Sequence, residues 1–248
     1  MLEGAGVALL PGDPGRVANL ASLPPFTNPK ELAYHREFRS MLTTLGDHRV
    51  LVTSTGIGGP STAIVIDELA QLGIRAFLRV GTTGAIQPGI EPGEIIITTG
   101  AVRLDGASTH YAPIEYPAVA HYHMVQALIQ ASQELSIPYH AGVTASTDTF
   151  YPGQERKGFS GYIPLRFEGQ TEELRRLHVL NYEMESATVL TLTSCMGLIG
   201  GCVEGVVINR TSNESINPED LKLGEHNATR VAVKAIEILF VNEGIGGR

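Results

Sequence analysis

Residues 146–156, Ser-Thr-Asp-Thr-Phe-Tyr-Pro-Gly-Gln-Glu-Arg, place an aromatic ring, an amide and a guanidinium close together in the chain. Phe150 offers a flat apolar face, the Gln154 amide both donates and accepts, and Arg156 is a rigid fork of donors. Together these groups suit a planar polar heterocycle such as uracil, which needs an acceptor for its N3 hydrogen and donors for two carbonyls. An exposed turn with a solvated arginine is the alternative.

A second candidate lies near the N-terminus, where residues 11–16 read Pro-Gly-Asp-Pro-Gly-Arg. They follow a short apolar run at 7–10 and precede a helical pattern that begins at Val17. A strand, a Gly-rich turn and a helix start point backbone N–H groups at an anion, and Arg16 adds a charged fork. The turn matches neither the Walker spacing nor a dinucleotide fingerprint, so a plain strand–helix turn stays open.

Arg79 interrupts the apolar run 77–80, which predicts a buried strand, and Thr82 and Thr83 follow. A buried guanidinium is costly unless an anion or a carboxylate pairs with it. Ligands of α/β sheets gather at the carboxyl ends of the strands, so we expect an anion site here.

Residues 181–188, Asn-Tyr-Glu-Met-Glu-Ser-Ala-Thr, place two carboxylates on either side of a methionine at the start of an apolar helix. Such carboxylates can accept hydrogen bonds from a sugar diol, and Met184 can lie against the sugar face. Acidic residues also favour helix N-termini for electrostatic reasons alone, so this alternative stays open.

Strand and helix patterns alternate along the chain, which predicts one α/β domain over residues 1–248. We expect a central twisted, mixed and mostly parallel sheet flanked by helices. The expected strands are 7–10, 50–53, 77–80, 94–99, a strand ending in 142–145, and 205–211; the expected helices start at 17 and 62 and cover 122–135 and 228–240. Ile64, Leu69 and Leu72 are expected on the buried face of the second helix, with Thr55 or Ser61 as its cap.

The net charge of −8, without a cluster of Lys and Arg, argues against a nucleic-acid surface. No apolar run reaches the roughly 20 residues that span a bilayer. Cys195 and Cys202 lack metal-ligand spacing and are interpreted as buried, reduced thiols, which suits the cytoplasm. The first residues lack the basic flank of a signal peptide.

These motifs occur in an order that resembles the first nucleoside phosphorylase family, and within it the pyrimidine branch, the uridine phosphorylases. The resemblance rests on residues 11–16, 35–38, 54–62, 78–84, 146–156, 181–187 and 207–211, which run along nearly the whole chain. It implies reversible phosphorolysis: uridine and phosphate give uracil and ribose 1-phosphate. Phosphate is then a co-substrate, and no further cofactor is expected.

The resemblance also implies a role for individual residues. It implies a phosphate site formed by Gly12, Arg16, Arg79 and Thr82, to which a neighbouring subunit contributes Arg36. It implies a uracil site formed by Phe150, Gln154, Arg156 and Arg210. The implied ribose-binding residues are Thr82, Met184 and Glu185. Arg79, Arg156, Arg210 and Glu185 are the expected catalytic residues. Glu37, Ile57 and Ser61 match positions that hold potassium between two subunits of a hexamer built as a trimer of dimers. Residues 1–10 lack the histidine that in the family reaches the ribose 5′-hydroxyl, so we expect Glu185 to hold the ribose.

Three other functions fit parts of the pattern. Purine nucleoside phosphorylases place an aspartate after the strand that corresponds to residues 206–208, where this chain has Asn209-Arg210-Thr211 and no aspartate. A nucleosidase, which uses water in place of phosphate, would leave three arginines around the anion site unexplained. A nucleoside-binding module without catalysis would have no need of an intact phosphate site.

Overall fold

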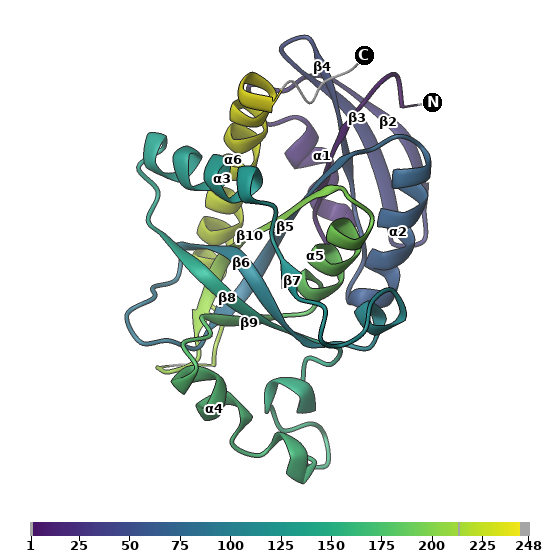
Figure 1. The fold of residues 1–248 in the computed structure, drawn as a ribbon. Helices are drawn as coiled ribbons and strands as arrows, with labels where there is room; N and C mark the ends of the chain where they lie inside the picture. Colours follow the sequence, from purple (N-terminus) through teal and green to yellow (C-terminus); the bar gives the residue numbers. More distant parts are fainter. Residues whose placement is uncertain (1, 213, 244–248) are drawn as a thin grey trace.

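The computed structural model describes residues 2–212 and 214–243, in which helices pack on both faces of a twisted mixed sheet (Figure 1). The strands are β1 Val7–Leu10, β2 Thr27–His35, β3 Phe38–Leu45, β4 His48–Thr53, β5 Ala76–Ala85, β6 Ile95–Leu104, β7 Ala118–Val119, β8 Tyr139–Thr147, β9 Asn181–Glu183 and β10 Ile199–Asn209. The helices are α1 Pro14–Ala21, α2 Gly59–Gln71, α3 Tyr122–Glu134, α4 Gln170–Arg176, α5 Ser186–Cys195 and α6 Pro218–Glu243. The expected α/β architecture with a mixed sheet and flanking helices is confirmed.

Half of the sheet closes on itself. Strands β10, β6, β8, β9 and β5 pair in that order, and β10 pairs again with β5, while β1, β4, β3 and β2 extend from β5 as an open sheet. The strands β4, β1, β5 and β10 are parallel neighbours, whereas β2, β3 and β4 form antiparallel pairs. The carboxyl ends of β1, β4 and β5 therefore lie at the same end of the molecule.

The edge of β5 that faces away from β10 has a gap between its neighbours. β1 pairs with it as far as Arg79, and β9 pairs with it only from Gly84. Between these points the described chain provides no strand to fill the edge of residues 80–83. A side chain takes one of the free positions, because Arg16 Nη1 donates to the Val80 carbonyl at 3.2 Å. This gap leaves room for a cavity beside the strand.

Two apolar layers hold the sheet in place. One core packs helices α1, α3 and α6 against the sheet, with Leu9, Val52 and Leu78 fully buried. Helices α2 and α5 cover the other face around Leu10, Leu51 and Phe77. Each fully buried aliphatic side chain contributes about 1.5–3 kcal/mol, so this core fixes the strands that carry the polar groups.

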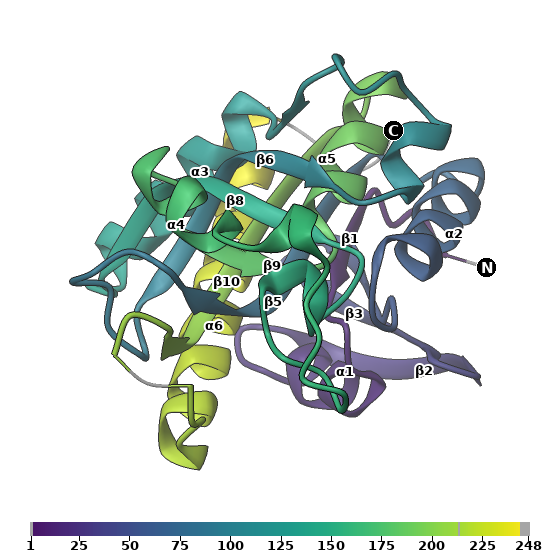
Figure 2. The same cartoon turned by 90° about the horizontal axis from the view of Figure 1, so that it is seen from below.

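Turns and loops at the carboxyl ends lie against each other. Gly56 N donates to Gly12 O at 3.0 Å, and Thr55 N donates to Pro11 O at 2.9 Å. The segment with the 3₁₀ turns Pro152–Gln154 and Leu165–Phe167, followed by α4, lies over the same end of the sheet, as the view from below shows (Figure 2).

Several expectations about single elements were wrong. Arg79 lies in the middle of β5 and not at its end, because the strand continues to Ala85. Ile64 and Leu72 are each 50% exposed, since they lie on the outer side of α2 and Leu69 alone of the three is buried. Neither Thr55 nor Ser61 caps α2: its cap is Gly58, which has a φ of +89° that favours glycine. Cys195 is exposed, because it ends α5 at the surface, whereas Cys202 is buried.

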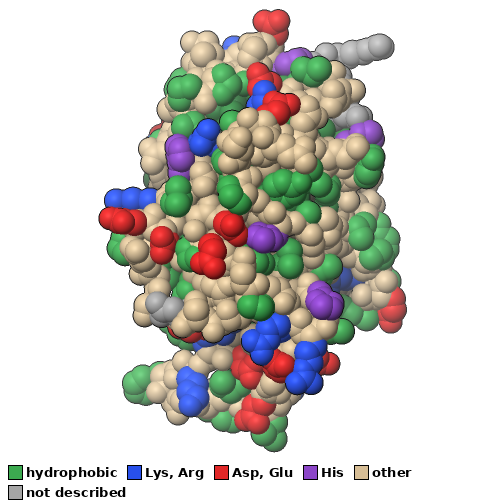
Figure 3. Space-filling model, turned by 90° about the vertical axis from the view of Figure 1, so that its left-hand side faces the viewer, with side chains coloured by type: hydrophobic (Ala, Val, Ile, Leu, Met, Phe, Trp, Pro, Cys, Tyr) green, Lys and Arg blue, Asp and Glu red, His purple; other side chains and the backbone are tan. Residues whose placement is uncertain are grey.

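On the face shown in Figure 3, Lys and Arg side chains are interspersed with Asp and Glu. Among the residues that the structure describes, no helix has both the length and the apolar character needed to cross a membrane.

Candidate active site

A cavity of about 1400 Å³ opens at the gap beside β5. Its wall includes most of the residues singled out in the sequence: Gly12, Arg16, Glu37, Ile57, Ser61, Arg79, Thr82, Phe150, Gln154, Arg156, Met184 and Glu185. Arg36 and Arg210 are not part of the wall. The carboxyl ends of several strands thus bring together groups that lie far apart in the chain.

The N-terminal turn supplies one end of the cavity. The Asp13 carboxylate accepts from Gly15 N at 2.7 Å and caps α1, which fixes the turn that carries Gly12 and Arg16. Arg16 Nε lies 3.6 Å from Glu225 Oε1, and Arg16 Nη2 is buried without a hydrogen-bond partner in the described chain. Burial lowers the pKa of Arg16. A buried donor without a partner is costly, so this nitrogen is suited to a bound anion.

Arg79 provides a second donor of this kind. Its Nη1 is buried and lacks a hydrogen-bond partner among the described residues. Its other nitrogens face carboxylates: Nε lies 3.2 Å from Glu183 Oε2 and 3.8 Å from Glu204 Oε1, and Nη2 pairs with Glu185. Burial alone would lower the pKa of Arg79, but these carboxylates raise it. The guanidinium folds over Gly81, where a Cβ would lie 2.9 Å from Nη2.

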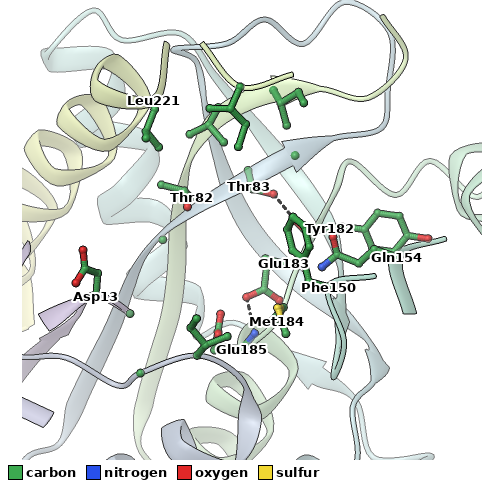
Figure 4. A pocket seen from close by; sticks show the side chains of 18 of the residues that line it. Asp13, Thr82, Thr83, Phe150, Gln154, Tyr182, Glu183, Met184, Glu185 and Leu221 are labelled. Carbon is green, nitrogen blue, oxygen red and sulfur yellow. Dashed lines mark hydrogen bonds between the residues drawn. The ribbon is translucent and has the colours of Figure 1, made fainter. Parts of the chain in front are cut away.

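Glu185 and Met184 lie in the middle of the cavity. In Figure 4 they stand between Asp13 on one side and Gln154 with Phe150 on the other. The Glu185 carboxylate is 4% exposed, accepts a hydrogen bond from Gly58 N, and has its pKa raised by burial. It therefore ties the start of α2 to Arg79 and presents an acceptor to the cavity.

The loop after β8 forms the other end. Gln154 Nε2 donates to Thr147 Oγ1 at 3.2 Å, and its Oε1 accepts from Arg156 Nη1. The Arg156 guanidinium lies 4.2 Å over the Phe150 ring. The sequence motif therefore folds into one continuous polar edge beside an aromatic face.

Arg210 lies behind this edge. Its guanidinium packs 5.2 Å from the centre of the Tyr182 ring, and Tyr182 itself lines the cavity. Glu214 joins the two arginines: its Oε1 accepts from Arg210 Nε at 2.5 Å and its Oε2 accepts from Arg156 Nε at 3.0 Å. Burial and the charge of Arg210 lower the pKa of Arg156. Arg210 can thus act on a ligand through Arg156.

Comparison with known proteins identifies the family of this chain. Residues 7–239 match the model of the phosphorylase superfamily. The chain belongs to this superfamily. It is 53% identical to the uridine phosphorylase of Salmonella typhimurium and 52% identical to that of Escherichia coli K12, in each case over 240 residues that cover 96% of this chain and 94% of the relative. It is 48% identical to the Haemophilus influenzae uridine phosphorylase over the same shares. The resemblance drawn from the motifs is confirmed.

Arg36 lies outside the cavity of this superfamily member. It is exposed in the turn between β2 and β3, where its φ is +54°. Its neighbour Glu37 does line the cavity, and a Cβ on Gly56 would approach both the Glu37 side chain and Ser61 Oγ. Ser61 Oγ donates to the Ile57 carbonyl at 3.2 Å. The three predicted potassium ligands therefore lie together, although the described residues hold no group of three His, Cys, Asp or Glu suited to a metal.

Sequence reasoning missed three residues that lie at or next to the cavity of this superfamily member. Glu204 is an isolated acid in the apolar run of β10, which is the same signal that drew attention to Arg79. Tyr182 lines the cavity and packs against the Arg210 guanidinium, and this position could not be read from a single strand. Glu214 follows Arg210 in a polar segment that gives no local signal.

Proposed function

We propose that this phosphorylase superfamily member cleaves uridine reversibly with phosphate to give uracil and ribose 1-phosphate. One observation carries the proposal. Unpartnered guanidinium nitrogens of Arg16 and Arg79 serve one end of the cavity, and the Gln154–Arg156 edge forms the other. Met184 and Glu185, which are the proposed ribose-binding residues, lie between these two ends.

The phosphate dianion binds to Arg16 Nη2 and Arg79 Nη1 beside Gly12 and Thr82. Its oxygen attacks C1′ of the ribose as the bond from C1′ to N1 of the base breaks. Positive charge that develops on the ribose ring is stabilised by the phosphate and by Glu185. The reaction needs no covalent nucleophile on the protein.

Uracil leaves with the electron pair of the broken bond and is protonated afterwards from solvent. Arg156 and Gln154 donate to its carbonyl oxygens, where negative charge develops, and Phe150 lies against the ring. Such donors in a site that excludes water are each worth roughly 10²–10³ in rate. Arg210 supports Arg156 through Glu214, which joins both guanidinium groups.

The same proposal includes assembly into a hexamer in which Arg36 completes the phosphate site of a neighbouring subunit. Arg36 is exposed and lies away from its own cavity, and the nearby Tyr34 and Ile57 are 59% and 80% exposed. Glu37, Ile57 and Ser61 offer only oxygen donors, which suits a hard cation such as potassium at this interface. A cytoplasmic location is also part of the proposal.

The structure favours a pyrimidine over a purine base. Asn209 Nδ2 donates to the carbonyls of Gln87 at 2.9 Å and Ile90 at 2.7 Å, and its Oδ1 accepts from Thr211 N at 2.8 Å. The amide is fully used in holding two loops, so it does not protonate a purine. The paired Arg16 and Arg79 donors support phosphate rather than water as the acceptor.

The decisive experiment follows absorbance with uridine or inosine, each with and without phosphate. We expect loss of uridine only when phosphate is present. Loss of uridine without phosphate would identify a nucleosidase, preferred cleavage of inosine would identify a purine enzyme, and no cleavage would leave a binding module.

A further inference from the structure

Glu204 is the most deeply buried acid near the cavity. It lies in β10 and has no exposed surface. Its Oε2 accepts from Asn181 Nδ2 at 2.8 Å, and its Oε1 lies 2.9 Å from Ser186 Oγ. Neither partner is charged, and Glu204 does not line the cavity. The proposed mechanism gives this residue no role.

Three carboxylates surround one guanidinium at this point. Glu183 has the backbone N–H groups of residues 185 and 186 as partners in addition to Arg79, and Glu185 has Gly58 N together with Arg79. Glu204 lies farther from the guanidinium, at 3.8 Å from Nε. Because one positive charge cannot neutralise three buried negative ones, the acid with neutral partners is the one that keeps its proton.

We propose that Glu204 is a positioning residue for Arg79, held as a neutral acid so that the site can accept a phosphate dianion. As a neutral acid it accepts from Asn181 and donates to Ser186 Oγ, because a hydroxyl can serve in either direction. The group formed by Arg79 and the three glutamates then carries a net charge of −1 rather than −2. If Glu204 loses its proton, a further negative charge competes with phosphate for Arg79.

The surroundings of Glu204 agree with this assignment. The titratable and charged groups that face it are Arg79 from β5, Glu183 from β9, Glu185 from the start of α5, and Cys202 on its own strand. Burial raises the pKa of Glu204, and Glu183 adds to the rise against the effect of Arg79. Burial also keeps the Cys202 thiol neutral by raising its pKa. The inference rests on the proposed phosphate site at Arg79.

The test compares Glu204→Gln, Glu204→Ala and the surface control Glu237→Gln with the parent protein. A glutamine amide offers one acceptor and one donor, as the neutral acid does, so Glu204→Gln should bind phosphate at neutral pH within about twofold of the parent. Glu204→Ala removes the hydrogen bonds to Asn181 and Ser186, so Arg79 loses this support. The KM for phosphate should then rise more than about tenfold, about the effect of losing one hydrogen bond to a charged group. Isothermal titration with inorganic phosphate provides a second readout besides activity.

The pH profile separates positioning from a merely structural role. The ratio of the phosphate KM of the parent to that of Glu204→Gln should be near one at neutral pH and should rise at higher pH, as the parent's acid ionises. Taking this ratio cancels the ionisation of phosphate itself. Profiles that superimpose at all pH values, or a Glu204→Gln protein that loses phosphate binding or does not fold at neutral pH, would overturn the inference.

Stability gives an independent check. A carboxyl that is protonated in the folded chain but ionised in the unfolded chain stabilises the fold less as pH rises above the ordinary range of Glu. The thermal midpoint of the parent should therefore fall relative to that of Glu204→Gln as pH rises, and an unchanged difference would also contradict the inference. If the parent shows no phosphate dependence, the proposed function fails, while the stability comparison still tests Glu204.

Discussion

Arg16 gives the cleanest test of the phosphate site. Arg79 is a poor choice, because its removal would leave several buried carboxylates without a counter-charge, which costs about 3–5 kcal/mol of stability. The side chain of Arg16 is 15% exposed, and its carboxylate neighbour Glu225 is 34% exposed, so Glu225 can be solvated when Arg16 is removed. We therefore choose Arg16→Ala.

The magnitude follows from the contacts of Arg16. Its Nη2 is free to make a charge-assisted hydrogen bond to phosphate, worth about 1.5–3 kcal/mol. The KM for phosphate should therefore rise roughly 10- to 150-fold. The KM for uridine should change by less than about threefold, because Arg16 lies at the end of the cavity opposite the base edge. The lost bond to the Val80 carbonyl should cost about 1 kcal/mol of stability.

The assay measures initial rates over a range of phosphate at saturating uridine, and then over a range of uridine at saturating phosphate. Arg49→Ala is the matched control, since its guanidinium pairs with Glu3 at the surface and is not part of the cavity wall. The reasoning is refuted if Arg16→Ala leaves the phosphate KM unchanged, or raises the KM for uridine as much as that for phosphate.

Three further predictions concern the base site, the Asn209 network and the assembly. Arg156→Ala should lower kcat/KM for uridine by about 2–4 kcal/mol of transition-state binding, and unchanged turnover would place the base elsewhere. Asn209→Asp replaces an amide that donates to two backbone carbonyls with a group that can only accept, so the free energy of unfolding measured in urea should fall by about 2–4 kcal/mol. An unchanged free energy of unfolding, or new activity on inosine, would contradict this structural role of Asn209. Mixed oligomers of inactive Arg36→Ala and inactive Arg156→Ala chains should regain activity, and demonstrably mixed oligomers that remain inactive would place Arg36 in its own subunit's site.

The sequence was most informative where one side chain conflicts with its surroundings. Arg79 in an apolar run predicted a paired or ligand-binding guanidinium, and the structure pairs it on two sides and leaves one nitrogen free. The Gln154–Arg156 motif predicted a polar edge beside a ring, because all its members lie in one turn. These inferences needed only local chemistry.

Features that depend on distant segments could not be predicted in the same way. Strands β2 and β3 were missed, because the exposed residues of β2 do not alternate regularly between apolar and polar. The closure of β10 onto both β5 and β6 is a property of the whole sheet. The position of Glu214 between Arg156 and Arg210 likewise depends on how two loops meet.

Phosphorus NMR of uridine and inorganic phosphate incubated with the protein tests the proposed reaction most directly. Transfer of the ribosyl group to phosphate predicts one ribose 1-phosphate for each uracil released, with loss of an equal amount of inorganic phosphate. Release of uracil without a phosphate ester would show that water is the acceptor, and it would contradict the roles proposed for Arg16 and Arg79.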